Sequence, residues 1–391
     1  MLAHNVAWQG SAVRALSLAR PLARRGHEVT VVAARGEPGL SALSDAVDGV
    51  TLLQPADVAP RRLRNGGLSP LDLAGRLWLA RRFEADVVHA FEPRPTATLP
   101  ALLLRRRLGI PYVADWADLW GPDGMGAIWP PFERRTLGAF DGWLQERTRR
   151  SADAVTAISS NLAQRAVALG VPSDRVQLLR VGANDDTFRP GDPVVARRRL
   201  GLPADALVAV HTGFAPFDDH LLADSWVQVA RVEPRAFMLT AGRRVEALDR
   251  AAARAGSVAR VRQLGTLAYA DLGAVMAAGD VMLLPYASNP HNDARFPNRL
   301  GDYAAAGRPV VTNPTGDLAA LIESERIGRL AEPTPAAMAA AVVALLHDDE
   351  ERLAMGRRAR AYAEGKGSWR ARAIELEELY EELVRRSRSS S

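Results

Sequence analysis

The sequence of 391 residues contains no cysteine and a single lysine. Without cysteine the chain has no disulfide, no thiolate nucleophile and no cysteine-bound zinc. No run of eighteen or more uncharged apolar residues occurs, which argues against a membrane-spanning helix. The N-terminus lacks a basic segment followed by an apolar core, so we expect no signal peptide and a cytoplasmic protein.

Positive charge is carried almost entirely by arginine, a bias that a GC-rich bacterial genome explains as well as any function. Residues 1–150 hold 20 arginines against 15 acidic residues, so the net charge of +5 belongs to this half. Its clusters at 61–64, 81–82 and 105–107 suit an anionic acceptor or a peripheral membrane contact, although solvated helix faces explain them more simply. No nucleic-acid-binding signature accompanies them, so we expect no nucleic acid partner.

Short apolar runs alternate with amphipathic stretches from end to end, the pattern of βα units and parallel sheets. The alternation pauses near 180–193, at glycines and prolines, and then restarts. The length suits two domains, each with its own core. We therefore predict an α/β protein with two doubly wound, Rossmann-like domains and a crevice between them: an N-terminal domain over 1–185, a C-terminal domain over 186–368, and a helix with a tail over 369–391.

The most informative segment covers residues 280–311. An apolar strand over 280–285 precedes an irregular loop, and a short helix begins at Pro297 or Asn298 and stops at Gly307. Helix starts carry free backbone N–H groups and a positive dipole end, which suit a diphosphate.

Three charged side chains accompany this helix start. Arg295 and Arg299 flank it and can bind phosphate oxygens, and Asp302 lies one turn inside, where a carboxylate can accept from ribose hydroxyls. An ordinary surface cap with an Arg–Asp pair explains the same residues equally well.

In its order of landmarks the chain resembles retaining glycosyltransferases of the GT-B fold, family 4 (group 1). The strand at 280–285 and the turn at 305–311 match the family closely, and the first turn at Gly10-Ser11, the strand at 86–89 and the final helix from Trp369 follow in order. The resemblance implies a nucleoside-diphosphate sugar held by the C-terminal domain, an acceptor held by the N-terminal domain, and a final helix that packs back toward the N-domain.

The departures from the family pattern concern the donor site. The family's Glu-x7-Glu motif becomes Ala294 and Asp302, and Phe214 follows Gly213 where the family has arginine. The family's Lys-Gly pair is absent as well. Phosphate charge would then come from Arg243, Arg244, Arg295 and Arg299.

The N-terminal half offers candidates where strands end. His89 is a candidate contact to sugar or a satisfied structural histidine. Asp118 can orient the acceptor hydroxyl or act as a base, and Trp116 and Trp120 either stack on a sugar or fill the core. Residues 121–132 read as an acceptor-side loop. We expect no metal site, because the adjacent residues Asp218-Asp219-His220 suit a solvated helix start.

We therefore predict transfer of a sugar from a nucleoside diphosphate to an acceptor hydroxyl, with retention of configuration at the anomeric carbon. The acceptor is expected to be a sugar, a lipid-linked molecule or a small molecule, and we expect no cofactor or metal. A nucleotide-sugar epimerase and a catalytically silent partner protein remain as alternatives. The predicted catalytic residues are His89, Asp118 and Asp293; the donor site comprises Gly10, Ser11, Gly213, Phe214, Arg243, Arg244, Asn292, Arg295, Phe296, Pro297, Asn298, Arg299, Leu300 and Asp302; the acceptor site comprises Trp8, Trp116 and Trp120.

Overall fold

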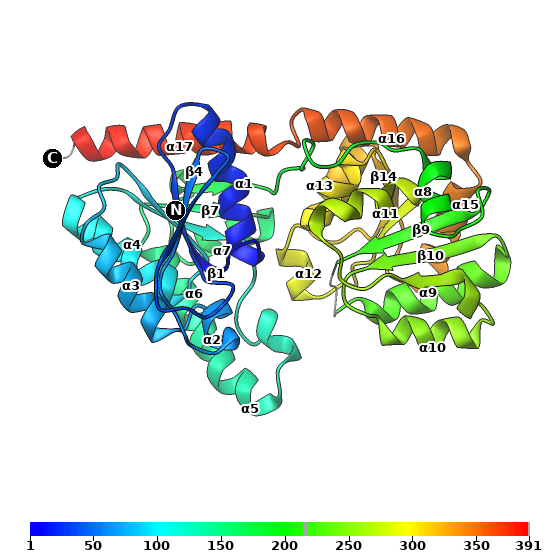
Figure 1. Ribbon diagram of the computed structural model, residues 1–391, viewed down its shortest axis with the longest axis horizontal. Coiled ribbons are helices and arrows are strands. Elements are labelled where there is room, and N and C mark those ends of the chain that lie inside the picture. The colour runs from blue at the N-terminus through cyan, green and yellow to red at the C-terminus, as the bar shows by residue number, and fades with distance from the viewer. Residues whose placement is uncertain (214–216, 390–391) are drawn as a thin grey trace. The chain divides into compact units, whose positions relative to one another are not determined.

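The computed structural model describes residues 1–213 and 217–389, and of Ile128 the backbone alone. It forms two compact α/β units (Figure 1). The first comprises 1–181, 294–296 and 369–391, and the second comprises 182–293 and 297–368. The chain thus passes between the units at 181/182 and 368/369, and again on either side of residues 294–296. The predicted junctions were at 185/186 and 368/369.

The first unit is built on an eight-stranded sheet of order β3-β4-β2-β1-β5-β6-β7-β8. All its described neighbours are parallel except the β3–β4 pair. That antiparallel hairpin was not predicted, because β3 is mostly exposed and lacks an apolar run. The strands are β1 (Leu2–Val6), β2 (Thr30–Ala34), β3 (Leu43–Val47), β4 (Val50–Gln54), β5 (Val88–Phe91), β6 (Tyr112–Trp116), β7 (Ala154–Ala157) and β8 (Val176–Leu178).

Helices cover this sheet, and each follows from local sequence. Most of α1 is buried, including every residue from Arg14 to Ala19, and Gly26, with φ 98°, takes the left-handed turn after the helix. The final helix α17 packs on α1, as predicted (Figure 1), and Glu377 accepts from Arg25 and His27. The helices are α1 (Gly10–Arg24), α2 (Arg61–Asn65), α3 (Pro70–Ala80), α4 (Pro95–Leu108), α5 (Pro131–Glu133), α6 (Ala139–Arg150), α7 (Ser160–Ala168) and α17 (Trp369–Ser389).

The second unit is built on a six-stranded, fully parallel sheet of order β11-β10-β9-β12-β13-β14. Its strands are buried apolar runs, which is why they could be predicted closely from sequence. They are β9 (Leu207–Thr212), β10 (Ala236–Ala241), β11 (Val261–Gln263), β12 (Val281–Leu284), β13 (Val310–Thr312) and β14 (Gly328–Leu330).

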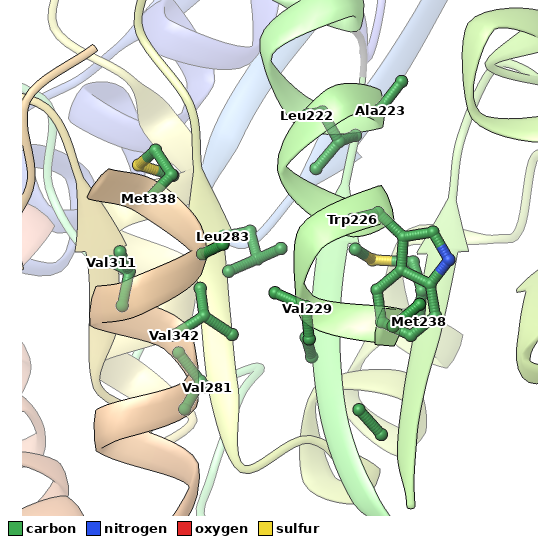
Figure 2. Packing of buried hydrophobic residues seen from close by; sticks show 14 of the residues in the cluster. Leu222, Ala223, Trp226, Val229, Met238, Val281, Leu283, Val311, Met338 and Val342 are labelled. Atoms are coloured by element: carbon green, nitrogen blue, oxygen red, sulfur yellow. The ribbon is translucent and has the colours of Figure 1, made fainter. Parts of the chain in front are cut away.

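The core of the second unit lies between this sheet and helices α9, α10 and α15. Figure 2 shows Trp226 of α9 beside Met238 of β10, and the indole N–H of Trp226 donates to Ser257 at 3.1 Å. The helices of this unit are α8 (Pro193–Arg199), α9 (Asp219–Val232), α10 (Glu246–Arg254), α11 (Leu272–Ala278), α12 (Pro290–Ala294), α13 (Asn298–Ala305), α14 (Leu318–Glu325), α15 (Pro335–Leu346) and α16 (Asp349–Glu364).

Two local expectations need correction. The stretch before Pro297 contains the short helix α12 and is not an irregular loop. The expected loop at residues 121–132 contains a 3₁₀ turn at Met125–Ile128 and leads into α5. Asp218 does not start a solvated helix: it is buried and accepts from the backbone N–H of Ala287 at 2.8 Å.

The predicted start and stop of α13 are confirmed. The helix begins at Asn298 after Pro297, and the N-cap residue Pro297 makes no side-chain capping bond. Gly307 follows the C-cap with φ 67°, a left-handed conformation that glycine adopts without strain.

Candidate functional site

The carboxyl edge of the first sheet rests on a buried ion pair. Arg14 of α1 binds Asp115, at the end of β6, through two hydrogen bonds of 2.9 Å each. Thr156 also donates to Asp115 at 2.7 Å, and the backbone carbonyl of Asp115 accepts from Arg149 at 2.6 Å. The Arg14 guanidinium holds the pKa of the Asp115 carboxyl below its usual range against the opposing effect of burial. The strand end is therefore fixed by charge as well as by packing.

His89 lies inside this network. Its Nδ1 contacts the hydroxyl of Tyr380 on α17 at 2.6 Å, and its Nε2 contacts the hydroxyl of Thr156 at 3.2 Å. Burial lowers its pKa to about 3, so the ring is neutral. With both nitrogens engaged and the ring buried, the geometry favours the structural alternative for His89 over contact with a sugar.

Glu92 organises the residues that follow β6, and sequence analysis did not identify it. It has φ 72°, directly after β5, and its Oε1 accepts from the backbone N–H groups of Ala117 and Asp118 at 2.8 and 3.0 Å. Its Oε2 accepts from the indole of Trp120 at 2.5 Å. Glu92 thereby fixes the backbone at Asp118, a half-buried carboxyl whose pKa burial raises.

The three predicted acceptor tryptophans have different surroundings. Trp116 is fully buried, so neither face is open to a sugar, and core filling accounts for it. Trp120 is half-buried, with the Arg94 guanidinium 4.0 Å from its ring centroid. Trp8 is exposed, has φ 70°, and lies in the turn after β1. Trp8 and Trp120 therefore remain accessible candidates.

The turn between β1 and α1 is closed by side chains. The Ser11 backbone N–H donates to Asn5 Oδ1 at 2.7 Å, and the Ser11 hydroxyl contacts His4 Nδ1 at 3.1 Å. Gly10 has φ 43°, and a Cβ there would lie 2.3 Å from Asn5 Oδ1. This turn therefore requires glycine, as expected of a first βα turn in such folds.

At the carboxyl edge of the second sheet, Arg299 reaches from α13 to the end of β9. Its Nη1 donates to the carbonyl of Thr212 at 2.8 Å and to His211 Nε2 at 3.1 Å. His211 Nδ1 lies 3.1 Å from the carbonyl of Leu283, which can only accept, so Nδ1 carries the proton. Burial and the Arg299 charge lower the His211 pKa to about 3, and the neutral ring positions the guanidinium.

Gly213 makes room for that guanidinium. It follows β9 with φ 85°, and a Cβ there would lie 3.1 Å from Arg299 Cδ. Gly242, after β10, has φ 134°, and a Cβ there would lie 2.5 Å from the Gly213 carbonyl. The two strand ends therefore approach closely beside a fixed arginine. The predicted neighbour Phe214 lies outside the described residues.

Asp302, one turn along α13, is held on one side. Its Oδ1 accepts from the Tyr269 hydroxyl at 2.7 Å and from the Asn184 amide at 3.0 Å. Its Oδ2 accepts no hydrogen bond from any residue that the structure describes. Burial raises the Asp302 pKa to about 6. The carboxyl is thus oriented by two neighbours and keeps one oxygen for another donor.

A second polar cluster joins α12 to the start of α9. Asn292 is fully buried and donates to Asp218 Oδ1 at 2.8 Å and to the carbonyl of Ala287 at 2.7 Å. Its own Oδ1 is buried and has no hydrogen-bond partner within residues 1–213 and 217–389. Asp293 is half-buried, and a Cβ at Gly316 would lie 2.8 Å from its carbonyl. Asn292 therefore offers an acceptor next to Asp293.

The other predicted donor residues divide between ion pairs and packing. Arg243 and Arg244 are exposed and pair with Asp219 and Asp249. Phe296 is buried under the Arg180 guanidinium at 5.7 Å, within the first unit. Half-buried Arg295 also belongs to that unit, Pro297 and Leu300 are buried, and Asn298 is exposed at the start of α13.

Two of the residues that position these groups had a sequence signal, since Glu92 and His211 lie at strand ends where such folds place ligands. Tyr269 and Asn184 had none, because folding alone brings them to Asp302.

Among the described residues, no group of three histidine, aspartate or glutamate side chains is arranged to hold a metal ion. No helix in the described part of the chain is long and apolar enough to cross a bilayer.

Comparison with known proteins gives the family. Residues 9–182 match the glycosyl transferase 4-like domain, and residues 218–348 match the glycosyl transferases group 1. The chain belongs to the GT-B glycosyltransferases of family 4.

Relatives of the chain include proteins named D-inositol 3-phosphate glycosyltransferase. The protein from Thermobispora bispora is 30% identical over 228 residues, 55% of this chain and 52% of that protein. The chain thus spans about half the length of the first curated relatives it matches. A protein of the same name from Xylanimonas cellulosilytica is 27% identical over 96% of this chain and 92% of that protein.

Solved structures support the GT-B fold of the chain. Sucrose-phosphate synthase from Thermosynechococcus elongatus has a TM-score of 0.76 and 18% identity, and covers 98% of both chains. Anabaena HepE in complex with UDP-glucose has a TM-score of 0.74 and 18% identity, and covers 97% of this chain and 98% of its own. At such identities the likeness concerns the fold alone.

Proposed function

We propose that the protein transfers a sugar from a nucleoside-diphosphate sugar to an acceptor hydroxyl, with retention at the anomeric carbon and without a metal ion or cofactor. The observation that carries the proposal is the pair of side chains on α13. Arg299 is fixed by His211 at the carboxyl edge of the second sheet, and Asp302, one turn along, keeps Oδ2 without a partner among the described residues.

This pair suits the two ends of a nucleoside diphosphate. A guanidinium at a strand end can bind phosphate oxygens and stabilise the charge that develops on the leaving diphosphate. An ionised carboxyl oriented through Oδ1 can accept from a ribose hydroxyl through Oδ2. Because the N-cap residue Pro297 makes no side-chain capping bond, the first N–H groups of α13 can add further donors. UDP-glucose, bound by Anabaena HepE, is therefore the first donor to test.

On the acceptor side, Asp118 is the residue we propose to orient the incoming hydroxyl. Its backbone is held by Glu92, and burial raises the pKa of its carboxyl. Trp120 and Trp8 are the aromatic surfaces that can contact the acceptor. Asn292 and Asp293 are the proposed contacts to the transferred sugar. The acceptor in this proposal is a sugar, a lipid-linked molecule or a small molecule. The protein itself acts in a bacterial cytoplasm, in peripheral contact with the membrane.

The test is turnover of radiolabelled UDP-glucose, GDP-mannose, ADP-glucose and TDP-glucose, with and without EDTA. Slow hydrolysis of one donor, unchanged by EDTA and lost in Arg299→Met, supports the proposal. The anomeric configuration of the released sugar, followed by proton NMR, should match that of the donor. Conversion to a new nucleotide sugar would identify an epimerase instead. Tight binding of a donor without turnover would identify a silent partner protein.

A further inference from the structure

Residues 131–150 form one continuous helical stretch, in which a π-helical segment, Arg134–Gly138, joins α5 to α6. Surface helices of globular proteins bury an apolar face and expose a polar one. This stretch does the reverse. Its buried residues are small, polar or charged, namely Gly138, Asp141, Gln145, Thr148 and Arg149.

The exposed side of the same stretch is apolar and aromatic. Phe132 is 78% exposed, Trp143 58%, Leu137 51% and Phe140 47%. The last three are spaced three residues apart, and Phe132 precedes Leu137 by five residues across the wider π-helical turn. The four residues, here called the aromatic face, therefore follow one side of the helix. Figure 1 shows α5 at the tip of the first unit, away from its strands.

The charged residues around the aromatic face have one sign. The exposed ionisable side chains of 131–150 are Arg134, Arg135, Arg147 and Arg150. Asp141 is buried against Arg94, and the remaining two acidic residues of the stretch are half-buried. Exposed aromatic area beside exposed cations complements a surface that is apolar underneath and anionic at its boundary.

We propose that the aromatic face docks on an anionic lipid bilayer. Phe132, Leu137, Phe140 and Trp143 enter the boundary between headgroups and acyl chains, where aromatic side chains are favoured. The arginines bind lipid phosphates, and their long side chains allow the charge to remain at headgroup level. A second copy of the chain is a poorer occupant, because a symmetric contact would bring two cationic faces together.

The docking helix is tied directly to the acceptor side of the first unit. Gln145 exchanges two hydrogen bonds with the backbone of Trp120, at 2.7 and 3.0 Å. Arg149 donates to the carbonyl of Asp115, and Asp141 binds Arg94 beneath the Trp120 ring. Docking therefore holds the segment that contains Asp118 at the membrane surface. From this position we infer that the acceptor is lipid-linked. This last step rests on the proposed function.

The docking surface differs from the arginine clusters noted in the sequence. Arg64 is buried and donates to the carbonyls of Arg35 and Ala59. Arg105 donates to the carbonyl of Ser151. Those clusters are partly used inside the fold, whereas the four arginines beside the aromatic face are exposed.

The experiment is flotation of the full chain with vesicles of phosphatidylglycerol and phosphatidylcholine, and with vesicles of phosphatidylcholine alone. We expect at least about tenfold stronger binding to the anionic vesicles. Circular dichroism of each variant confirms that it folds. The docking variant is Phe132→Ser/Phe140→Ser/Trp143→Ser, the charge variant is Arg134→Gln/Arg135→Gln/Arg147→Gln, and the matched control is Val232→Ser/Val258→Ser/Leu353→Ser, three exposed apolar residues of the second unit.

The docking variant should lose binding by at least about tenfold, and the charge variant by about fivefold for each arginine removed, while the control binds as the unmodified chain does. Absence of binding to anionic vesicles, equal binding to both vesicle types, or equal loss in the control would overturn the proposal. So would a dimer in solution that the docking variant abolishes, since this would identify a second copy as the occupant. An acidic protein partner is indicated if vesicles fail to bind but an acidic peptide does, which also contradicts the proposal.

Donor binding separates this inference from the proposed function. Each variant is also titrated with the nucleoside diphosphate of the preferred donor, and the docking variant should bind it as the unmodified chain does. A chain that binds the diphosphate but no vesicle retains the proposed function and loses the docking site. A chain that binds vesicles but no nucleotide retains the docking site and loses the proposed function.

Discussion

Asp302→Asn is the substitution that tests the donor site most selectively. Asn is isosteric with Asp, and its Oδ1 can keep both bonds from Tyr269 and Asn184. The change therefore replaces Oδ2, which has no partner among the described residues, with an NH₂ group that cannot accept from a ribose hydroxyl. The fold is preserved while the proposed contact is lost.

The magnitude follows from the pKa of Asp302, which burial raises to about 6. A carboxyl with that pKa is about one-tenth ionised at about pH 5 and almost fully ionised at about pH 8. If the ionised form accepts from ribose, diphosphate affinity should rise about tenfold between these pH values, beyond the change seen in the Asn variant. Dividing the diphosphate affinity of the unmodified chain by that of the Asn variant at each pH cancels the effect of the titration of the phosphate itself. Isothermal titration calorimetry at both pH values gives this ratio, and an equal pH slope in both proteins would refute the assignment of Asp302.

The same carboxyl makes folding depend on pH. Its folded pKa of about 6 lies above the ordinary aspartate pKa of 3.8, so the folded state binds the proton more tightly than the unfolded state. Stability contributed by this proton is fully present below about pH 4 and is lost as pH rises to about 6, a loss of about 3 kcal/mol. Urea unfolding across this pH window should show the free energy of unfolding falling in the unmodified chain and depending less on pH in Asp302→Asn. If the free energies of the two proteins changed equally with pH, the raised pKa of Asp302 would be contradicted.

Three further changes test the frame around the site. Arg14→Met leaves the buried carboxylate of Asp115 without its partner, so urea unfolding should show a free energy of unfolding lower by about 3–5 kcal/mol. Arg25→Met removes one partner of an exposed ion pair and should lower the same free energy by about 1 kcal/mol or less. Trp226→Ala should cost about 3–5 kcal/mol in the same assay, and a cost below about 1 kcal/mol would show that the second core is less tightly packed than described. Glu92→Gln puts an amide NH₂ among three N–H donors, so we expect loosened residues 117–120 and slower transfer with unchanged diphosphate affinity; a change in affinity alone would contradict this role.

Much of the fold could be predicted because its strands are short buried apolar runs between amphipathic helices. The strand at Val281–Leu284 and the stop at Gly307 are examples, since each depends on local sequence. The hairpin of β3 and β4 could not be predicted in this way. Its first strand is exposed and contains Asp45, so its pairing depends on a neighbouring strand and not on its own composition.

The residues of the candidate site that local sequence marks could be predicted. Those that only folding brings together could not. Arg299 and Asp302 were identified because they follow a recognisable helix start. The partners of Asp302, Tyr269 and Asn184, come from other parts of the chain, and periodicity carries no information about such contacts. Asp218 was placed in solvent because its acidic neighbour suggested an exposed helix end, but the fold buries it against Asn292.

Binding of a nucleoside diphosphate is the measurement that tests the central claim most directly. The full chain is titrated calorimetrically with UDP, GDP, ADP and TDP, alongside Arg299→Met and Asp302→Asn. The account predicts that one diphosphate binds selectively at micromolar concentration and that both variants weaken it by at least about tenfold. Equal binding of all four by every variant, or no binding at all, would contradict a donor site built on α13.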